Sequence, residues 1–557
     1  PMPTALLMHS GILYAVRCIL ALPNCRWSPR QTPLARKVHT RKQDSGYPGR
    51  QTPLARARST SLPASLLPPM SLSVAVIGTG AGGLVTLREL LKEGHQATAF
   101  EQAEDVGGVW VYTEETETDP LGRDTGRRQV HSSMYAGLRT NLPREVMGFG
   151  HYPFTTTFPG SADPRQFPTH DEVRRYLAAY AAEFGLEPHI RFDSRVTQVR
   201  QEEASTGEAG APPRWRVSTA SSKSQAGAGV AKQEERQETF DAVVVCSGHF
   251  SQPKVPQLPG VESFPGQLFH SHNYRHASDF AGQRVVLLGA AASGSDIALE
   301  LLGTAKWVYL SARSFSNPLT GEPQAAAVHS DDEAEHASTG AAQRHVTKVS
   351  CISALHPDGS VELADGTLLP NIDTVLLCTG YSYTYPFLEP GHVTVDDVRV
   401  RPLYKHLFPP ADAPRLSFVG LCFKIAPFIQ SELQARWIAR SLSGRARALP
   451  SVEEMERDVQ AFDAALEAEG IPPRFTHRCQ GEYQWKLNRS YSEAAQGPIV
   501  GSWREEVFNA TGKLRTDFPE TYRNVGVGGG DKWALAAAAE AQALSEWEEG
   551  GRKPLGE

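Results

Sequence analysis

Two glycine-rich turns, about two hundred residues apart, have the composition needed to hold dinucleotides: Gly78-Thr-Gly-Ala-Gly-Gly83 and Gly289-Ala-Ala-Ala-Ser-Gly294. A pyrophosphate is bound by backbone N–H groups at a helix N-terminus, and a side chain at a position of close approach would block it. The first turn has glycine at each of these positions. The second has Ala291 in the middle, where we expect the pyrophosphate to fit after a slight shift.

The first turn lies within a strand–turn–helix pattern. Residues 74–77 are an apolar run typical of a buried strand, and residues 84–93 have the apolar spacing of a helix. A second strand, 96–100, ends at Glu101, 23 positions after Gly78. A carboxylate at this place can accept both hydroxyls of an adenosine ribose and disfavours a 2′-phosphate, so we predict FAD or NAD at the first site.

The second turn follows an apolar strand at 284–288 and begins a helical pattern that runs to 302. The next strand, 307–310, is followed by Ser311 and Arg313 and by no acid. Arginine at this position is the arrangement expected where a 2′-phosphate must be paired. We therefore predict NADPH rather than NADH at the second site.

The composition narrows the classes of partner. The chain has 557 residues, 40% of them apolar, and a net charge of −6, which favours a globular protein with a small substrate and no nucleic-acid partner. The seven cysteines form no Cys-x-x-Cys pair, so we expect neither a zinc site nor a redox pair, and a reduced, intracellular setting. Residues 11–22, the longest apolar run near the start, are too short to cross a bilayer, and the acidic helix expected at 532–547 is a poor membrane anchor. We expect a soluble protein without a transmembrane anchor.

The first seventy residues differ from the rest of the chain. They hold ten arginines and lysines from Arg17 to Arg58 against a single acid, Asp44. This composition is typical of organelle transit peptides, and equally of translated upstream sequence before a start at Met70. We expect a disordered leader of either origin, and a cytoplasmic location or, if the leader is a transit peptide, chloroplast or mitochondrion.

Between and beside the turns lie further patterns: Phe264-x-Gly-x-x-x-His-x-x-x-Tyr274, Cys378-Thr-Gly-Tyr381, residues 138–147 around Asn141, and residues 102–110. On these segments the chain resembles the flavin-containing monooxygenases, class B flavoprotein monooxygenases. The resemblance covers about residues 71–444 and is nearest the plant-type branch that oxygenates sulfur in thioethers. Cys378 departs from the family's more usual alanine.

The resemblance implies an α/β fold with two Rossmann-like dinucleotide-binding domains, the NADP domain being inserted into the FAD domain. We place the FAD domain at 71–255, the NADPH domain at 256–372, and the second part of the FAD domain, with C-terminal helices, at 373–557. A strand at 373–378 is expected to return the chain to the first domain. Residues 218–239 and 316–344 are polar tracts, expected to be surface loops.

The resemblance also implies the site residues. Asn141 is the expected catalytic residue. The residues expected to bind the cofactors FAD and NADPH are Gly78, Thr79, Gly80, Ala81, Gly82, Gly83, Glu101, Gly107, Gly108, Val109, Trp110, Thr140, Asn141, Gly289, Ser293, Gly294, Ser295, Asp296, Arg313, Thr379 and Gly380. No metal is expected. His270, within the Phe264–Tyr274 pattern, is expected to be structural.

The implied reaction begins with reduction of FAD by NADPH. O2 then adds to the flavin as a C4a-hydroperoxide, which passes one oxygen atom to a soft nucleophile, a thioether sulfur or an amine nitrogen. The Asn141 amide would hydrogen-bond the oxygen adduct. The specific substrate and the oligomeric state, a homodimer included, stay open.

Four alternatives stay open beside this interpretation. A Baeyer–Villiger oxygenase shares the layout but carries Trp where Tyr274 stands, and a flavin disulfide reductase needs a cysteine pair that the spacing does not show. An N-hydroxylating or auxin-type relative fits the context of Asn141 less well. A non-catalytic relative that kept the fold is disfavoured by the intact Gly78, Gly80, Gly83 and Asn141.

Overall fold

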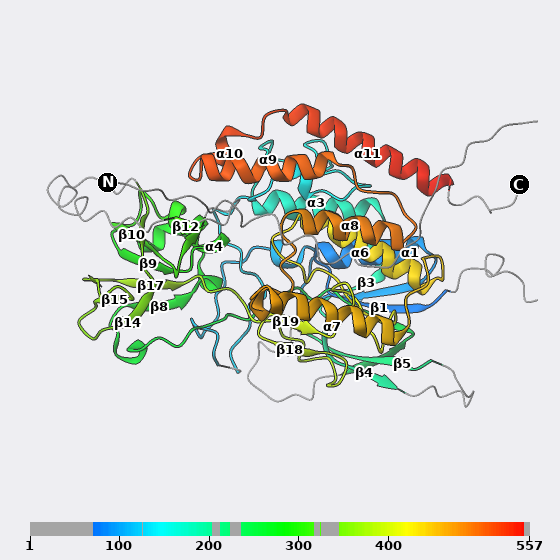
Figure 1. Cartoon of the computed structure of the whole chain (residues 1–557), viewed down its shortest axis with the longest axis horizontal. Helices are drawn as coiled ribbons and strands as arrows, with labels where there is room; N and C mark the ends of the chain where they lie inside the picture. Colours follow the sequence, from blue (N-terminus) through cyan, green and yellow to red (C-terminus); the bar gives the residue numbers. More distant parts are fainter. Residues whose placement is uncertain are drawn as a thin grey trace, which may run out of the picture. The chain divides into compact units, whose positions relative to one another are not determined.

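The computed structural model describes residues 71–124, 126–202, 212–222, 235–316, 323–324 and 345–550. The leader at 1–70 and most of the two polar tracts lie outside these residues. The described residues form two parallel β-sheets. Each sheet is covered on one face by helix and on the other by a smaller antiparallel sheet (Figure 1). The predicted α/β class with two Rossmann-like domains is confirmed.

The first parallel sheet has the order β20-β7-β1-β2-β3. Its strands are β1 (Ser73–Ile77), β2 (Gln96–Phe100), β3 (Ile190–Arg191), β7 (Ala242–Val245) and β20 (Leu416–Phe418). The strands are short and apolar because a parallel sheet is buried on both faces. The two strands predicted around the first turn are confirmed.

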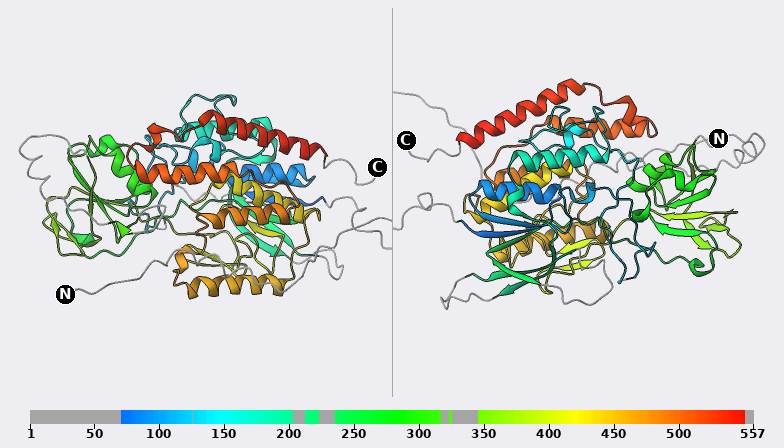
Figure 2. Two further views of the ribbon diagram at one scale, coloured as in Figure 1. Left: turned by 45° about the horizontal axis from the view of Figure 1, so that its top comes forward. Right: turned by 180° about the vertical axis from the view of Figure 1, so that it is seen from behind.

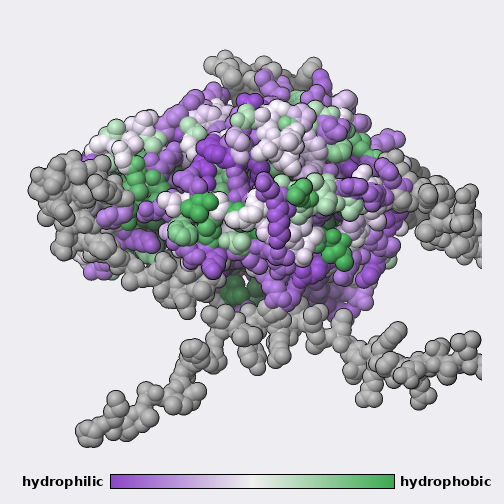
Figure 3. Space-filling model, turned by 90° about the horizontal axis from the view of Figure 1, so that it is seen from above, coloured by the Kyte–Doolittle hydropathy of each residue, from purple (hydrophilic) through white to green (hydrophobic). Residues whose placement is uncertain are grey.

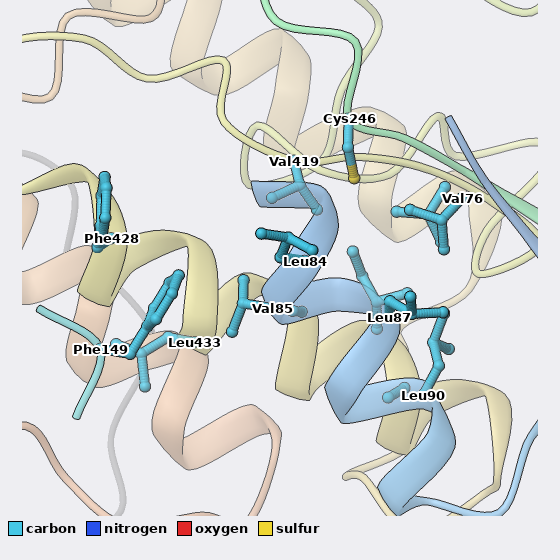
Figure 4. Packing of buried hydrophobic residues seen from close by; sticks show 14 of the residues in the cluster. Val76, Leu84, Val85, Leu87, Leu90, Phe149, Cys246, Val419, Phe428 and Leu433 are labelled. Atoms are coloured by element: carbon cyan, nitrogen blue, oxygen red, sulfur yellow. The ribbon is translucent and has the colours of Figure 1, made fainter. Parts of the chain in front are cut away.

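Alternate residues of β1 serve two different cores. Val74 and Val76 pack among the helices α1 (Ala81–Lys92), α3 (His170–Glu183) and α6 (Pro427–Leu442), while Ala75 and Ile77 face the other way. Figure 4 shows the helical side, where Val76 and Cys246 lie near the apolar face of α1. On the opposite face the antiparallel sheet of β4 (Arg195–Glu202), β5 (Arg214–Ala220) and β6 (Arg236–Phe240) covers the strands. The ends of the first polar tract, expected to be loop, therefore belong to strands.

The second parallel sheet has the order β13-β10-β9-β17-β8. Its strands are β8 (Gln267–His270), β9 (Arg284–Leu288), β10 (Trp307–Ser311), β13 (Thr347–Val349) and β17 (Thr374–Leu377). Helix α4 (Ala292–Glu300) packs on one face of β9, and a sheet of β14 (Ile352–Leu355), β15 (Val361–Leu363) and β16 (Leu368–Leu369) packs on the other. The second unit thus repeats the layers of the first.

The second unit is inserted into the first, since β8 to β17 lie in sequence between β7 and β20. One boundary was wrong. The strand expected to return the chain to the first domain is β17, and it pairs in parallel with β8 and β9 of the second sheet. The strand is fully buried, and a strand buried in either parallel sheet would have the same apolar composition. The composition therefore did not indicate which sheet the strand joins.

The remaining elements include a helical C-terminal part. Its helices are α7 (Val452–Ala468), α8 (Glu482–Ala494), α9 (Trp503–Asp517), α10 (Tyr522–Val525) and α11 (Gly530–Gly550). Smaller elements are α2 (Arg144–Met147), the hairpins β11 (Phe315–Ser316) with β12 (Pro323–Gln324) and β18 (Thr394–Asp396) with β19 (Arg399–Arg401), and the 3-10 turns η2 (Gly108–Trp110), η3 (Glu187–His189), η5 (Val261–Ser263), η6 (Ser271–Asn273), η7 (Ala277–Phe280) and η8 (Pro473–Phe475). Helices α9 and α11 pack on each other and on α2, and both views of Figure 2 show α11, in red, beside α9, in orange-red.

Neither the described helices nor the surface drawn in Figure 3 has the features of a membrane-spanning segment. Within the described residues, no helix combines the length and the apolar character that a bilayer span needs. On the face drawn in Figure 3, hydrophilic side chains predominate and hydrophobic ones form small separate patches.

Candidate active site

The first glycine turn is closed by the backbone itself. Gly78 has φ +97°, and a Cβ there would lie 2.7 Å from the carbonyl oxygen of Cys246. A Cβ at Gly83 would lie 1.8 Å from the carbonyl oxygen of Gly78. Both glycines are therefore required by the fold, because no side chain can share the space of a backbone carbonyl.

The middle glycine is different, and it tests whether the turn fits a dinucleotide. A Cβ at Gly80 would have the Gly108 Cα as its nearest neighbour, at an ordinary 3.6 Å. Gly80 is the N-cap of α1, no side chain caps this end, and the first turn holds no acid. The helix N-terminus thus offers N–H groups to an anion and leaves the approach clear. The residues present fit a pyrophosphate.

Glu101 lies at the carboxyl end of β2, beside the first turn. Its Oε2 accepts hydrogen bonds from the Thr79 N–H at 2.9 Å and the Thr79 hydroxyl at 2.8 Å, and its Oε1 accepts from the Ala103 N–H at 2.8 Å. A carboxylate has about four acceptor positions. Three are taken by protein donors, so a ribose hydroxyl would have to replace the Thr79 hydroxyl to make two bonds here.

The segment 107–110 is joined to the first turn. The Gly107 N–H donates to the carbonyl oxygen of Thr79 at 3.1 Å, and Gly107 and Gly108 have φ of +129° and +57°. The Val109 carbonyl accepts from the Ser132 hydroxyl at 3.2 Å, and Trp110 packs half-buried against the helical core. The structure thus brings this predicted segment and the first turn together.

The second turn repeats the first in its outer glycines. Gly289 has φ +114°, its Cβ would lie 2.4 Å from the Cys378 carbonyl oxygen, and a Cβ at Gly294 would lie 1.7 Å from the Gly289 carbonyl oxygen. Ala291 is the N-cap of α4 with extended backbone, and α4 also lacks a side-chain cap and a first-turn acid. This end fits a second pyrophosphate.

The polar side chains after the second turn and after β10 are placed unequally. The Ser295 hydroxyl donates to the Ala290 carbonyl at 3.1 Å, whereas Ser293 is half-buried. Ser311 is fully buried, and its hydroxyl donates to the Ser350 carbonyl and accepts from the Ile352 N–H, so its hydrogen bonds are made within the chain. Arg313 is exposed and has no ion-pair partner among the described residues.

The loop that carries Asn141 holds two polar side-chain groups that make no hydrogen bond to any described residue. The Thr140 N–H donates to the Pro168 carbonyl at 2.8 Å, which fixes the loop against the start of α3. The Thr140 hydroxyl is buried and has no hydrogen-bond partner. The Asn141 amide is half-buried and makes no hydrogen bond to any described residue. An orphaned buried hydroxyl beside an unused amide suits a bound polar group.

Arg523, on α10, was missed by sequence reasoning. Its Nε donates to the Thr140 carbonyl at 2.9 Å, and its Nη1 pairs with Asp296 of α4. The other oxygen of Asp296 accepts from the Tyr135 hydroxyl. The carboxylate of Asp296, expected to bind a cofactor, therefore ties the Asn141 loop to the helix that follows the second turn.

The remaining predicted positions lie where the two units meet. The Thr379 hydroxyl donates to the Lys254 carbonyl at 2.5 Å, and Gly380 has φ +83° with open space around its Cβ position. His270 is fully buried on the edge strand β8, where its Nδ1 accepts from the His272 N–H and burial lowers its pKa to about 4. A neutral imidazole bonded within the chain agrees with the structural role that we expected.

The chain is similar in sequence to known flavin-dependent monooxygenases. Residues 71–320 and 341–488 match the model of a family described as flavin-binding monooxygenase-like. The flavin-containing monooxygenase FMO GS-OX-like 2 of Arabidopsis thaliana is 43% identical over 459 residues, 82% of this chain and 92% of its own length, and FMO GS-OX5 of the same plant is 41% identical, covering 83% and 92%.

Solved structures give the same result. The S-allyl-L-cysteine S-oxygenase of Allium sativum superimposes with a TM-score of 0.75 at 39% identity, covering 86% of this chain and 100% of that one. Tmm from Pelagibacter sp. strain HTCC7211 has a TM-score of 0.63 at 23% identity, covering 81% and 93%, and shows the fold alone.

Proposed function

We propose, because this chain belongs to the flavin-binding monooxygenase-like family, that it inserts one oxygen atom of O2 into a thioether sulfur, with amine nitrogen as the second substrate class. Family membership makes it a monooxygenase that uses FAD and NADPH, as the sequence resemblance implied. The thioether is supported by the Allium enzyme, whose name gives an S-allyl cysteine as substrate and whose whole length this chain covers.

The observation that carries the proposal is the pair of closed glycine turns. In each, the outer glycines lie against backbone carbonyls and the helix N-terminus has no side-chain cap. We assign FAD to the first turn, with Glu101 on its ribose and residues 107–110 along it. We assign NADPH to the second turn, with Ser293 and Gly294 at the pyrophosphate and Arg313 on the 2′-phosphate.

FAD, reduced by NADPH, supplies the activation of O2 when it is bound. The chain's own residues would orient the cofactors and protect the reacting oxygen from water. The Asn141 amide would donate a hydrogen bond to the oxygen that is transferred, and the buried Thr140 hydroxyl would hydrogen-bond the bound cofactor. Arg523 acts as a positioning residue, because it fixes the carbonyl next to Asn141 and pairs with Asp296 of the nicotinamide unit. Thr379 and Gly380, which lie where the two units meet, would contact the flavin.

The substrate class is tested on the purified full chain. A thioether such as S-allyl-L-cysteine, a tertiary amine such as N,N-dimethylaniline, and a cyclic ketone are each supplied with NADPH and O2. Sulfoxide, N-oxide and lactone are measured by mass spectrometry against NADPH consumed. We expect sulfoxide to form with the highest ratio of product to NADPH. Lactone as the main product, or no product with bound flavin present, would refute the proposal.

The role of Asn141 is tested by Asn141→Ala. Loss of the amide should leave the rate of flavin reduction by NADPH within about twofold. It should lower the sulfoxide formed per NADPH by roughly tenfold or more, since a hydrogen bond to a charged or strongly polar group contributes about 1.5–3 kcal/mol. The lost oxygen is measured as hydrogen peroxide. Asn509→Ala, on the exposed side of α9, is the matched control, and an unchanged coupling ratio in Asn141→Ala would rule the role out.

A further inference from the structure

Two cysteines that are 57 positions apart meet in the interior. The Sγ atoms of Cys422 and Cys479 lie 2.9 Å apart, and both residues are buried. A disulfide bond is about 2.0 Å long, so the pair is a dithiol in this structure. Two sulfurs this close need only a small movement to bond.

The backbone around the pair is already joined. Phe423 and Arg478, the neighbours of the two cysteines, form a parallel β-bridge. The Phe423 N–H donates to the His477 carbonyl at 3.0 Å, and the Cys479 N–H donates to the Phe423 carbonyl at 3.2 Å. The two chain segments are thus held in register at the cysteines, and a bond between the sulfurs requires little backbone displacement.

His406 also has a ring nitrogen near the two sulfurs, which raises a metal site as the other possibility. Its nitrogens are both occupied. The Val400 N–H donates to His477 Nε2 at 3.1 Å, so the neutral His477 ring carries its proton on Nδ1 and donates it to His406 Nδ1 at 3.0 Å. His406 then carries its own proton on Nε2, toward the Tyr483 hydroxyl at 3.1 Å. No lone pair of His406 remains for a metal, so the sulfurs are better explained as partners of each other.

We propose that Cys422 and Cys479 form a redox site that hydrogen peroxide converts from a dithiol to a disulfide. One thiol loses its proton and attacks a peroxide oxygen, the O–O bond breaks, and a sulfenic acid and a first water result. The second sulfur attacks the sulfenic sulfur, the S–O bond breaks, and the second water leaves. Two thiols and one peroxide therefore give one disulfide and two waters. Burial raises the pKa of the Cys479 thiol, so the site responds to sustained peroxide rather than to a brief pulse.

The site lies on a segment that passes the first glycine turn. Val419, three residues before Cys422, is the nearest side chain to the Cβ position of Gly82, at 3.3 Å. Val419 and Leu421 also line a hollow with Ser247 beside the same turn. A disulfide at Cys422 therefore anchors the wall of the first dinucleotide site to the segment before α8. This consequence rests on the proposed assignment of FAD to the first turn.

The test uses the full chain with FAD bound. Reduced protein is incubated with hydrogen peroxide, free thiols are alkylated, disulfides are reduced, and the new thiols are alkylated with a second reagent before peptide mass mapping. We expect Cys422 and Cys479 to take the second reagent together, and unreduced digests to contain their linked peptide. Cys246 and Cys378 should take the first reagent, as should the half-buried Cys351, which is the internal control. In Cys479→Ser, the linked peptide and the second label at Cys422 should both disappear.

Three results would overturn the proposal. The first is oxidation of either cysteine to a sulfinic acid with no linked peptide. The second is persistence of both free thiols at peroxide concentrations that oxidise Cys351. The third is one equivalent of zinc in the purified protein, whose removal by a chelator is needed to label both thiols.

A second measurement tests the link to the first turn. FAD release on dilution should slow at least threefold on oxidation of the wild type and stay unchanged in Cys479→Ser, and equal release rates would refute the link to the first turn. The thiol measurements do not depend on oxygenation, so failure of the proposed function leaves them decisive.

Discussion

The two glycine turns are built alike where they meet the protein and differ where they meet a ligand. In both, the first glycine has positive φ and faces the carbonyl of a cysteine that directly follows the neighbouring strand, Cys246 after β7 and Cys378 after β17. In both, the third glycine faces the carbonyl of the first. The middle position is glycine in the first turn and Ala291 in the second. The outer positions are therefore set by the fold, and the middle one by how closely the dinucleotide approaches.

The helices that follow the two turns, α1 and α4, differ in the charges around their ninth residue. Glu89 of α1 and Glu300 of α4 are each the ninth residue of their helix. Glu89 is fully buried, and although burial alone would raise its pKa, Arg88 and Arg436 lower it to about 2. Glu300 is less buried, and burial, with Asp296 adding to it, raises its pKa to about 7. The Glu89 carboxylate is paired with cations inside the core, whereas the Glu300 carboxylate lies under Gly137, near Asn141, and accepts a hydrogen bond from the Tyr274 hydroxyl.

The outer glycines offer the largest test of this comparison. Gly83→Ala and Gly294→Ala should each destabilise the protein by about 3 kcal/mol or more, because each added methyl would overlap a carbonyl oxygen. Thermal unfolding followed by circular dichroism measures the loss. Gly82→Ala is the matched control, since its Cβ would lie 3.3 Å from the side-chain atom Val419 Cγ1, which can shift by a few tenths of an ångström, and meets no backbone carbonyl. A stable Gly83→Ala with wild-type unfolding would break the claim that the fold requires this glycine.

The middle positions should separate binding from folding. Gly80→Ala meets only ordinary contacts in the protein, so its unfolding temperature in the absence of FAD should match the wild type. Its affinity for FAD should fall by roughly tenfold or more, as expected for one methyl forced into a close-packed interface. Ala291→Gly should change NADPH affinity by less than about threefold, since glycine and alanine both fit an extended N-cap. FAD content from visible absorbance and NADPH titration are the measurements, and equal effects at the two positions would contradict the distinction.

The ends of the second strands of the two units give a third contrast, Glu101 against Arg313. Arg313→Ala should raise the KM for NADPH by roughly tenfold while leaving that for NADH nearly unchanged, because only NADPH carries the 2′-phosphate. Steady-state kinetics with both nucleotides measure the difference. Lys306→Ala, an exposed cation at the other end of β10, is the control. Parallel changes for both nucleotides would show that Arg313 does not recognise the phosphate.

The sequence predicted these turns because their requirements are local. Gly78 and Gly83 face each other across one turn, and Glu101 follows one strand, so their spacing alone indicates the site. The strands at 74–77, 96–100 and 284–288 were found for the same reason. Ser311 shows what the sequence does not predict. A serine at the end of a strand is the same residue type whether its hydroxyl faces a ligand or, as here, donates to the Ser350 carbonyl.

The contacts that sequence reasoning missed join distant segments. Arg523 reaches the carbonyl of Thr140 across 383 positions, and no periodic pattern indicates which of the chain's arginines would do so. The Cys422–Cys479 contact was missed because only short cysteine spacings indicate a pair from sequence, whereas tertiary folding brings together these two cysteines, 57 positions apart. The domain boundary at β17 was placed wrongly because the composition of a strand does not indicate which strands it pairs with.

The smallest effect concerns Glu300, and its dependence on pH makes it distinctive. Because folding raises the pKa of Glu300 from 4.5 to about 7, the folded state holds a proton that the unfolded state has released between these values. Stability from this group is complete below about pH 4.5 and is lost as pH rises through 7. Glu300→Gln has no such proton, so relative to the wild type it should gain about 1–2 kcal/mol between pH 5 and pH 8, after allowance for solvent screening.

Glu89→Gln provides the matched control at the equivalent position of α1. Since folding lowers the pKa of Glu89 to about 2, this carboxylate is ionised in both states from pH 5 to pH 8. Its loss should destabilise the protein by the same amount at every pH in that range, because Arg88 and Arg436, which would each lose this carboxylate, stay charged throughout. Unfolding temperatures of both variants across pH 5 to 8 decide the matter: a sloping difference for Glu300→Gln beside a flat one for Glu89→Gln is expected. Two flat differences would show that the two helices hold their ninth residues in the same electrostatic state.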